Sequence, residues 1–123
     1  MDDEALAIAY WREHRLASGN REERLQANVA QASGDVGDRV SDDPSSALLL
    51  LDALLAADEA DLVYAGCGPI EDLLYQHGPL VAEAVAQRCR QDERWRKAVA
   101  SVWLSGPERA AIPVLHLFLP PAG

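Results

Sequence analysis

The segment from Ser45 to Ala57 contains six leucines and is apolar on nearly every side when it is read as a helix. Asp43-Pro44 in front of it provides an N-cap and a first helical residue. A helix of this kind is buried in the middle of a domain. No segment shows the sustained alternation of a strand, and Val114–Leu119 is the one weak candidate. We therefore predict an all-α fold, a compact bundle of six or seven short helices in antiparallel pairs, or one or two turns of an α-solenoid.

The length of 123 residues predicts a single domain. Three parts follow from composition: acidic N-terminal helices and a loop in 1–43, a helical core in 44–105, and an apolar tail in 106–123. Asp2 or Asp3 caps a first helix to about Ala17, and Asn20 with Glu23 forms a capping box for a second. The Gly-, Ser- and Asp-rich stretch 33–43 is predicted to be a loop.

The segment 66–79 contains three glycines and two prolines, which favour turns and helix ends. Asp58 is expected to cap a short helix that Gly66 ends in the left-handed conformation. Pro69 then starts a helix, with Glu71 reaching back to the N–H of Gly68. Gly78 ends that helix and Pro79 starts another. The segment is therefore predicted to be a corner between packed helices.

The net charge of −9 is concentrated in one half of the chain. Residues 1–61 contain fourteen acidic and five basic residues, and residues 62–123 contain six of each. An acidic half repels phosphates, so we expect neither nucleic acid nor an anionic membrane as a partner. It favours solubility, or an acidic face that steers a basic protein toward the chain.

Cysteine content and hydropathy bear on location. Cys67 and Cys89 are too few for a disulfide framework and show no zinc spacing. The start Met-Asp-Asp-Glu is not a signal peptide, and no run reaches the length of a membrane span. These features predict a reduced, cytoplasmic protein.

The segment 66–78 also carries the residues with the most chemistry, but each has a structural explanation. It lacks the third glycine of a dinucleotide loop and the lysine of a P-loop. Glu71 and Asp72 are adjacent, so on a helix they point about 100° apart and do not converge on one atom. His77 continues an apolar stripe, where a histidine usually packs in the core or bonds the last carbonyls of its helix. Asp72 and His77 keep a binding option, and we predict no catalytic residue, metal site or cofactor.

The three tryptophans divide into two groups. Asp92 is expected to cap a helix whose inward positions include Trp95 and Trp103, two turns apart on one face. Trp11 on the acidic first helix is the expected exposed anchor for a partner.

The segments 66–78 and 92–103 resemble a family of small bacterial proteins of unknown function. Its pattern is a leucine-rich helix, G-x-G-P-(I/L)-E-D-L-L, an H-G turn and D-x-x-(F/W)…V-W. The resemblance spans about Pro44 to Leu104, and it departs from the pattern at Cys67, where alanine is commoner, and at Glu93, where proline is common. It implies an α-helical domain and brings no activity, cofactor or catalytic residue.

Three functions remain open. The first is a non-enzymatic module that binds a basic protein through Trp11, Asp38, Asp42 and Asp43, a description that an immunity or antitoxin-like protein fits. The second is a small hydrolase or ligand-binding domain centred on the Gly66–Gly78 hinge, with Glu71, Asp72, His77 and Cys67 as its residues. The third is a homodimer that buries its tail, Ile112–Leu119, against a second copy. We take the first as the main hypothesis.

Overall fold

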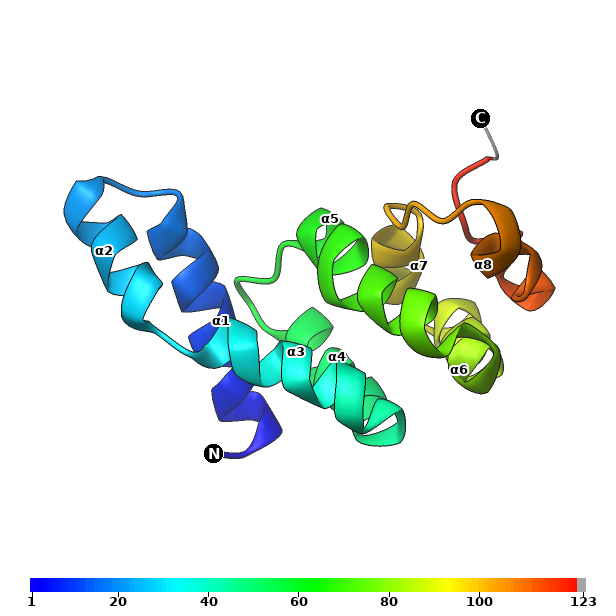
Figure 1. The fold of residues 1–123 in the computed structure, drawn as a ribbon, viewed down its shortest axis with the longest axis horizontal. Helices are drawn as coiled ribbons and strands as arrows, with labels where there is room; N and C mark the ends of the chain where they lie inside the picture. The colour runs from blue at the N-terminus through cyan, green and yellow to red at the C-terminus, as the bar shows by residue number, and fades with distance from the viewer. Residues whose placement is uncertain (122–123) are drawn as a thin grey trace.

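Helices account for nearly all of the regular structure in the computed structural model, which describes residues 1–121 (Figure 1). The last two residues of the predicted tail, 122–123, lie outside this range. No strand occurs in residues 1–121, so the predicted all-α fold is confirmed. In chain order the elements are α1 (Asp3–Ala17), α2 (Arg21–Val29), α3 (Ala32–Asp42), α4 (Pro44–Ala56), α5 (Leu62–Ala65), the π-helical turn η1 (Gly66–Ile70), α6 (Glu71–Gln91), α7 (Glu93–Val99), α8 (Gly106–Ala110) and the 3₁₀ turn η2 (Pro113–Leu115).

Helix α4 lies at the centre, as its leucines predict. Five of the six leucines are buried, and Leu49 alone points outward. Asp43 caps the helix by accepting a hydrogen bond from the Ser46 N–H, and Pro44 is its first residue. Asp52 ties α4 to α6 and α7, because its carboxylate accepts two bonds from Arg88, at 2.8 and 2.9 Å, and one from the Trp95 indole N–H, at 2.9 Å.

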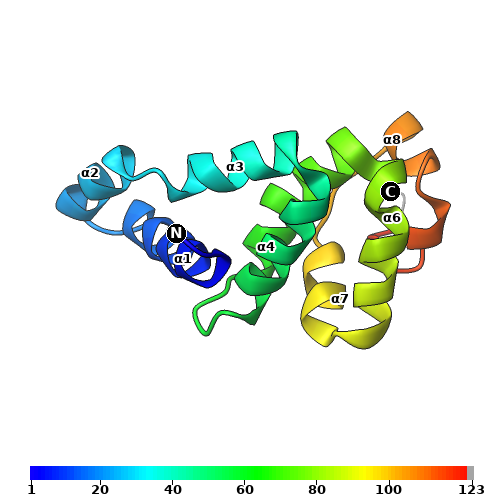
Figure 2. The ribbon, with the colours of Figure 1, turned by 90° about the horizontal axis from the view of Figure 1, so that it is seen from below.

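Helices α1 and α2, from the acidic first half of the chain, build one end of an elongated molecule, with α6 to α8 at the other end (Figures 1 and 2). Asp2 caps α1, and the predicted capping box of Asn20 and Glu23 opens α2. Helix α2 buries no residue, so it is a peripheral element held mainly against α1.

The predicted loop over residues 33–43 is wrong, because this stretch forms α3. Ala32, Val36 and Val40 recur every four residues and are buried, which gives the segment an apolar stripe. Its N-terminal N–H groups are capped from another helix, since the carboxylate of Glu13 accepts from Ala32 at 2.6 Å and from Ser33 at 3.3 Å. Packing and this distant cap outweigh the weak helix propensity of glycine, serine and aspartate.

The predicted corner at 66–79 is a continuous but kinked path from α5 through η1 into α6. Gly66 does not end a helix, since its φ of −67° and ψ of −52° are right-handed helical. Pro69 cannot donate to the carbonyl four residues back, and the π turn absorbs this loss with a bond from the Glu71 N–H to the Gly66 carbonyl. Helix α5 is capped by Asp61, not Asp58.

Gly78 and Pro79 do not separate two helices either. Both lie inside α6, and the kink that the proline requires falls at His77, with a φ of −132° and a ψ of 21°. The helix continues because buried residues on both sides of the kink, Leu74 and Val81, pack into the same core.

The tail folds back onto its own chain. Ile112, Leu115 and Leu119 are buried, and a Cβ placed on Gly78 would lie 3.1 Å from the Ile112 side chain. These residues therefore cover α6, and the apolar tail that suggested a homodimer is largely occupied within the monomer. No helix of residues 1–121 has both the length and the apolar character that crossing a membrane requires.

Candidate functional site

The outer face of α3 carries an unpaired acidic stripe. Asp35, Asp38 and Asp42 stand at i, i+3 and i+7, opposite the buried Val36 and Val40, and all three are exposed. None of the three carboxylates forms an ion pair or a side-chain hydrogen bond with another residue of the described chain 1–121. We call these three residues the α3 acidic stripe.

Most of this stripe works against helix stability. Asp38 and Asp42 are like charges four residues apart, which repel each other on a helix. Asp42 is the last residue of α3, where the helix dipole already presents negative partial charge. Asp43, which follows, has a structural role as the cap of α4. The charges of Asp38 and Asp42 therefore have no stabilising role that the structure explains.

His77 meets α3 at this same end. Its Nε2 lies 3.1 Å from the carbonyl oxygen of Ser41, and because a carbonyl only accepts, Nε2 carries the hydrogen. We expected His77 to bond the last carbonyls of its own helix, whereas it bonds one of α3. The structure thus joins His77 to Ser41, 36 residues away along the chain and next in sequence to the predicted Asp42.

The other residues of segment 66–78 do not converge. The Glu71 carboxylate accepts from the backbone N–H of Trp103 at 2.6 Å, and so it does not cap its own helix. The Cys67 thiol lies 3.8 Å from the Tyr64 carbonyl, and His77 is engaged with α3. Asp72 is exposed. The structure gives Cys67 and His77 separate partners and does not bring them together as a nucleophile and a base.

The expected exposed anchor is wrong. Trp11 is 2% exposed, and its indole N–H donates to the Leu54 carbonyl at 2.8 Å. Trp103, which we expected in the core, is 72% exposed because α7 ends at Val99. Val102 is the last residue of that face to be buried.

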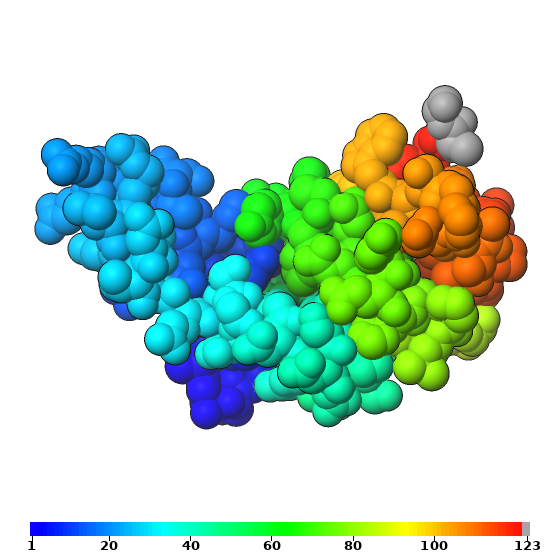
Figure 3. All heavy atoms as spheres, in the orientation of Figure 1, coloured from blue at the N-terminus to red at the C-terminus, as the bar shows by residue number. Residues whose placement is uncertain are grey.

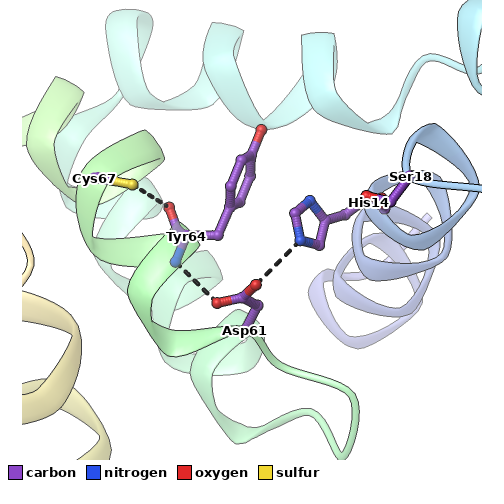
Figure 4. Close-up of polar contacts among 5 residues, drawn as sticks. All are labelled: His14, Ser18, Asp61, Tyr64 and Cys67. Carbon is purple, nitrogen blue, oxygen red and sulfur yellow. Dashed lines mark hydrogen bonds and ion pairs between the residues drawn. The ribbon is translucent and has the colours of Figure 1, made fainter.

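A cluster that the sequence did not reveal joins α1 to α5 (Figure 4). His14 Nε2 lies 3.2 Å from Asp61 Oδ2, and the His14 ring lies against Tyr64 with centroids 4.1 Å apart. Tyr10 is buried beside Tyr64, and burial followed by the charge of Tyr64 raises the pKa of its hydroxyl. His14 and Asp61 are 47 residues apart, so no local pattern links them. One local signal could have located half of this cluster: Asp61 stands three residues before Tyr64, the spacing of a helix N-cap.

The hollow beside this cluster is small. It measures about 160 Å³ and is lined by residues that include His14, Tyr64 and Ser33. Figure 3 shows a notch on this side of the molecule, between α2 and α5. Small-molecule sites usually measure about 300 to 1,000 Å³. The His14–Asp61 pair therefore serves as a joint between helices.

The charge of Asp61 is expected to make this joint sensitive to acid. The hydrogen bond from the Tyr64 N–H, and then the contact with His14, lower the pKa of Asp61. A carboxyl with a lowered pKa in the folded state stabilises the fold above its unfolded pKa of about 3.9, and loses this contribution as the pH falls through the folded value. We expect stability from urea titrations between about pH 5 and pH 3 to fall less steeply in Asp61→Asn than in the wild type.

Two features of this test separate the causes. Asparagine is also a good N-cap, so Asp61→Asn removes the charge while keeping the bond to Tyr64. His14→Gln should retain most of the wild-type slope, since the Tyr64 N–H is the larger cause. Equal slopes in the wild type and Asp61→Asn would contradict the prediction.

Comparison with known proteins places most of the chain in one family. The model of the "Family of unknown function (DUF6869)" matches residues 20–111. This range extends past both ends of the stretch 44–104 that the motif resemblance covered, and the motif itself stays a prediction. Searches among curated proteins and among solved structures returned no match to the chain.

Proposed function

We propose that this chain, which belongs to the Family of unknown function (DUF6869), is a non-enzymatic module that binds a basic protein through the α3 acidic stripe. An immunity or antitoxin-like role is one form of this proposal. The observation that carries it is the stripe itself: three exposed carboxylates on one helix face, of which Asp38 and Asp42 destabilise the helix that presents them.

The charges around the α3 acidic stripe also favour binding of a basic protein there. Arg39, the one basic residue of α3, is held by Asp3 at 3.1 Å and by the Ser46 hydroxyl at 2.8 Å, away from the stripe. The stripe belongs to the half of the chain that carries the net charge of −9. A negative field of this kind speeds the encounter with a basic partner and suppresses binding to acidic ones.

The test is charge reversal on the stripe with a matched control. Asp38→Lys/Asp42→Lys leaves the α4 cap Asp43 intact, and Glu22→Lys/Glu108→Lys changes the net charge by the same amount elsewhere. We expect the wild type and the control to retain the same basic protein from an extract of the source cell at low salt and to release it at high salt. The stripe variant should not retain it. Retention of that protein by the stripe variant would overturn the proposal.

Stability provides an independent prediction. The two lysines repel each other as the two aspartates did, so the gain comes from cations near the C-terminal end of α3 and from the higher helix propensity of lysine. Together these should raise the free energy of unfolding by about 0.5 to 1 kcal/mol. Chemical denaturation of Asp38→Lys/Asp42→Lys against the wild type measures this difference. A loss of stability would mean that the two aspartates support the fold, and the argument for their role in binding would fail.

A further inference from the structure

A groove runs between α1 and α4, apart from the residues of the α3 acidic stripe. It measures about 650 Å³ and includes the loop that follows α4, at Asp58 and Glu59. Figure 2 shows α1 beside α4, with this loop turned back toward α1. Its apolar lining is formed by Trp11, Ile8 and a set of alanines on both helices: Ala7, Ala53, Ala56 and Ala57.

The apolar lining offers an occupant almost no hydrogen bonds. The indole N–H of Trp11 is already bonded to the Leu54 carbonyl, and the alanine side chains have no polar atoms. Sites for small molecules place a few polar groups to fix the orientation of the ligand. Here the polar groups available are charged side chains, Glu4, Arg12, Arg15, Asp58 and Glu59, and none belongs to Trp11 or the alanines of the floor. Small side chains instead allow another helix to approach closely, since the distance between packed helices depends on the side chains at the contact.

Ile8 supports an apolar occupant. It is 60% exposed on the wall of the groove, although Leu6, Tyr10 and Trp11 of the same helix are buried and Leu16 is half-buried. A helix laid in the groove would cover this side chain. Recognition of that kind relies on apolar anchors at i, i+3 or i+4, and i+7 of the bound helix.

The charges on the rim select a basic helix. Arg15 and Glu59 neutralise each other across the groove at 3.0 Å. Glu4 and Asp58 form no ion pair among residues 1–121, and neither does Arg12, which leaves the rim with one net negative charge. The two unpaired carboxylates can therefore attract cations of a partner, while the charge of Arg12 repels them.

We propose that this groove binds an amphipathic helix of the basic partner, with its apolar stripe on the alanine-lined floor and with lysine or arginine side chains at Glu4 and Asp58. The proposal rests on the proposed function, which supplies the basic character of the partner. The residues of the groove that would make the contact are separate from the α3 acidic stripe.

The probes for this proposal are three synthetic peptides. The first combines leucine, alanine and lysine with leucine at helical spacing, the second is a shuffled version of it, and the third has glutamate in place of lysine. Isothermal titration calorimetry at low salt should show that the first binds with a Kd in the micromolar range and at least about tenfold more tightly than the other two. Equal binding of the shuffled or the acidic peptide, or no binding of the first, would overturn the proposal.

Variants locate the binding on the groove. Ile8→Ser and Ala56→Arg alter an exposed wall residue and an exposed lining residue, and each should weaken binding of the first peptide by about tenfold. Leu80→Ser, on an exposed leucine of α6 that does not line the groove, should leave it unchanged. Arg12→Glu should tighten binding by about threefold or more, because it replaces repulsion by attraction. An unchanged affinity in Ile8→Ser and Ala56→Arg, or a weaker one in Arg12→Glu, would contradict the assignment.

The stripe variant keeps the two proposals distinguishable. If the groove binds the helix, Asp38→Lys/Asp42→Lys should bind the first peptide as well as the charge-matched control Glu22→Lys/Glu108→Lys does. If only the stripe variant loses the peptide, the groove proposal fails and the stripe proposal survives. If the groove variants alone lose it while the stripe variant still retains the cellular partner, the stripe proposal fails and the groove proposal survives.

Discussion

Replacing Gly66 with alanine is expected to lower the free energy of unfolding by about 3 kcal/mol, the upper end of what overpacking usually costs. A Cβ at this position would overlap the backbone carbonyl oxygen of Ala98, and it would also press on the Ser101 side chain at 3.0 Å. The Ala98 carbonyl accepts a hydrogen bond from the Ser101 N–H at 3.0 Å, so α7 can yield only by disturbing its own C-terminal turn. Urea denaturation followed by circular dichroism measures the loss.

The same substitution elsewhere provides the control. Gly37 lies inside α3, and a Cβ placed there meets no atom within 4 Å. Gly37→Ala should therefore raise the free energy of unfolding by up to about 1 kcal/mol, since alanine has the higher helix propensity. The substitution is the same at both positions, so opposite signs of the change in unfolding free energy would show that the contact with α7 decides the result. A neutral Gly66→Ala would contradict the close packing of η1 against α7.

The two glycines also show where reading the sequence stops. The pattern around Gly66 predicted a left-handed helix end, because local chemistry offers that role to glycine most often. The real constraint is the approach of α7, more than thirty residues along the chain, which no local pattern contains. Gly37 has neither constraint and belongs to a helix that the composition of residues 33–43 hides.

Elements whose caps are local could be predicted. The capping box of α2 and the Asp43-Pro44 start of α4 involve residues within four positions of each other, and both are present as expected. Helix α3 depends on Glu13 of α1 for its N-terminal bonds, so its start has no local signal. The helical spacing of Val36 and Val40 did indicate a helix, but the glycines and aspartates of the same stretch favoured the prediction of a loop.

The candidate site was predicted in part for the same reason. Asp38 and Asp42 were singled out by charge, which composition reports, but their alignment along one helix face required α3 to be a helix. The meeting of His77 with Ser41, and of His14 with Asp61, depends on contacts 36 and 47 residues apart. Such pairings follow from the packing of helices, which periodicity constrains only to a face.

The tryptophans lead to the second large effect, because Trp11→Ala is expected to lower the free energy of unfolding by about 3 to 5 kcal/mol. The change removes a large buried side chain between α1 and α4. It also removes the donor to Leu54, whose carbonyl is among the last four of α4 and has no partner within the helix. The cavity in the core and the lost hydrogen bond at the end of α4 both lower the free energy of unfolding.

Trp103→Ala tests whether this loss belongs to the site of Trp11 or to tryptophan as such. Its side chain is 72% exposed, and the bond that Glu71 accepts comes from the backbone N–H, which alanine retains. We expect a change of no more than about 0.5 kcal/mol. Circular dichroism is the suitable probe, because both variants alter the fluorescence. If Trp11→Ala does not fold, Trp11→Phe keeps most of the volume and should still lose the bond to Leu54, at a cost of about 1 to 3 kcal/mol for the unpaired group. Equal losses at positions 11 and 103 would contradict the burial of Trp11, and with it the apolar floor on which the groove between α1 and α4 depends.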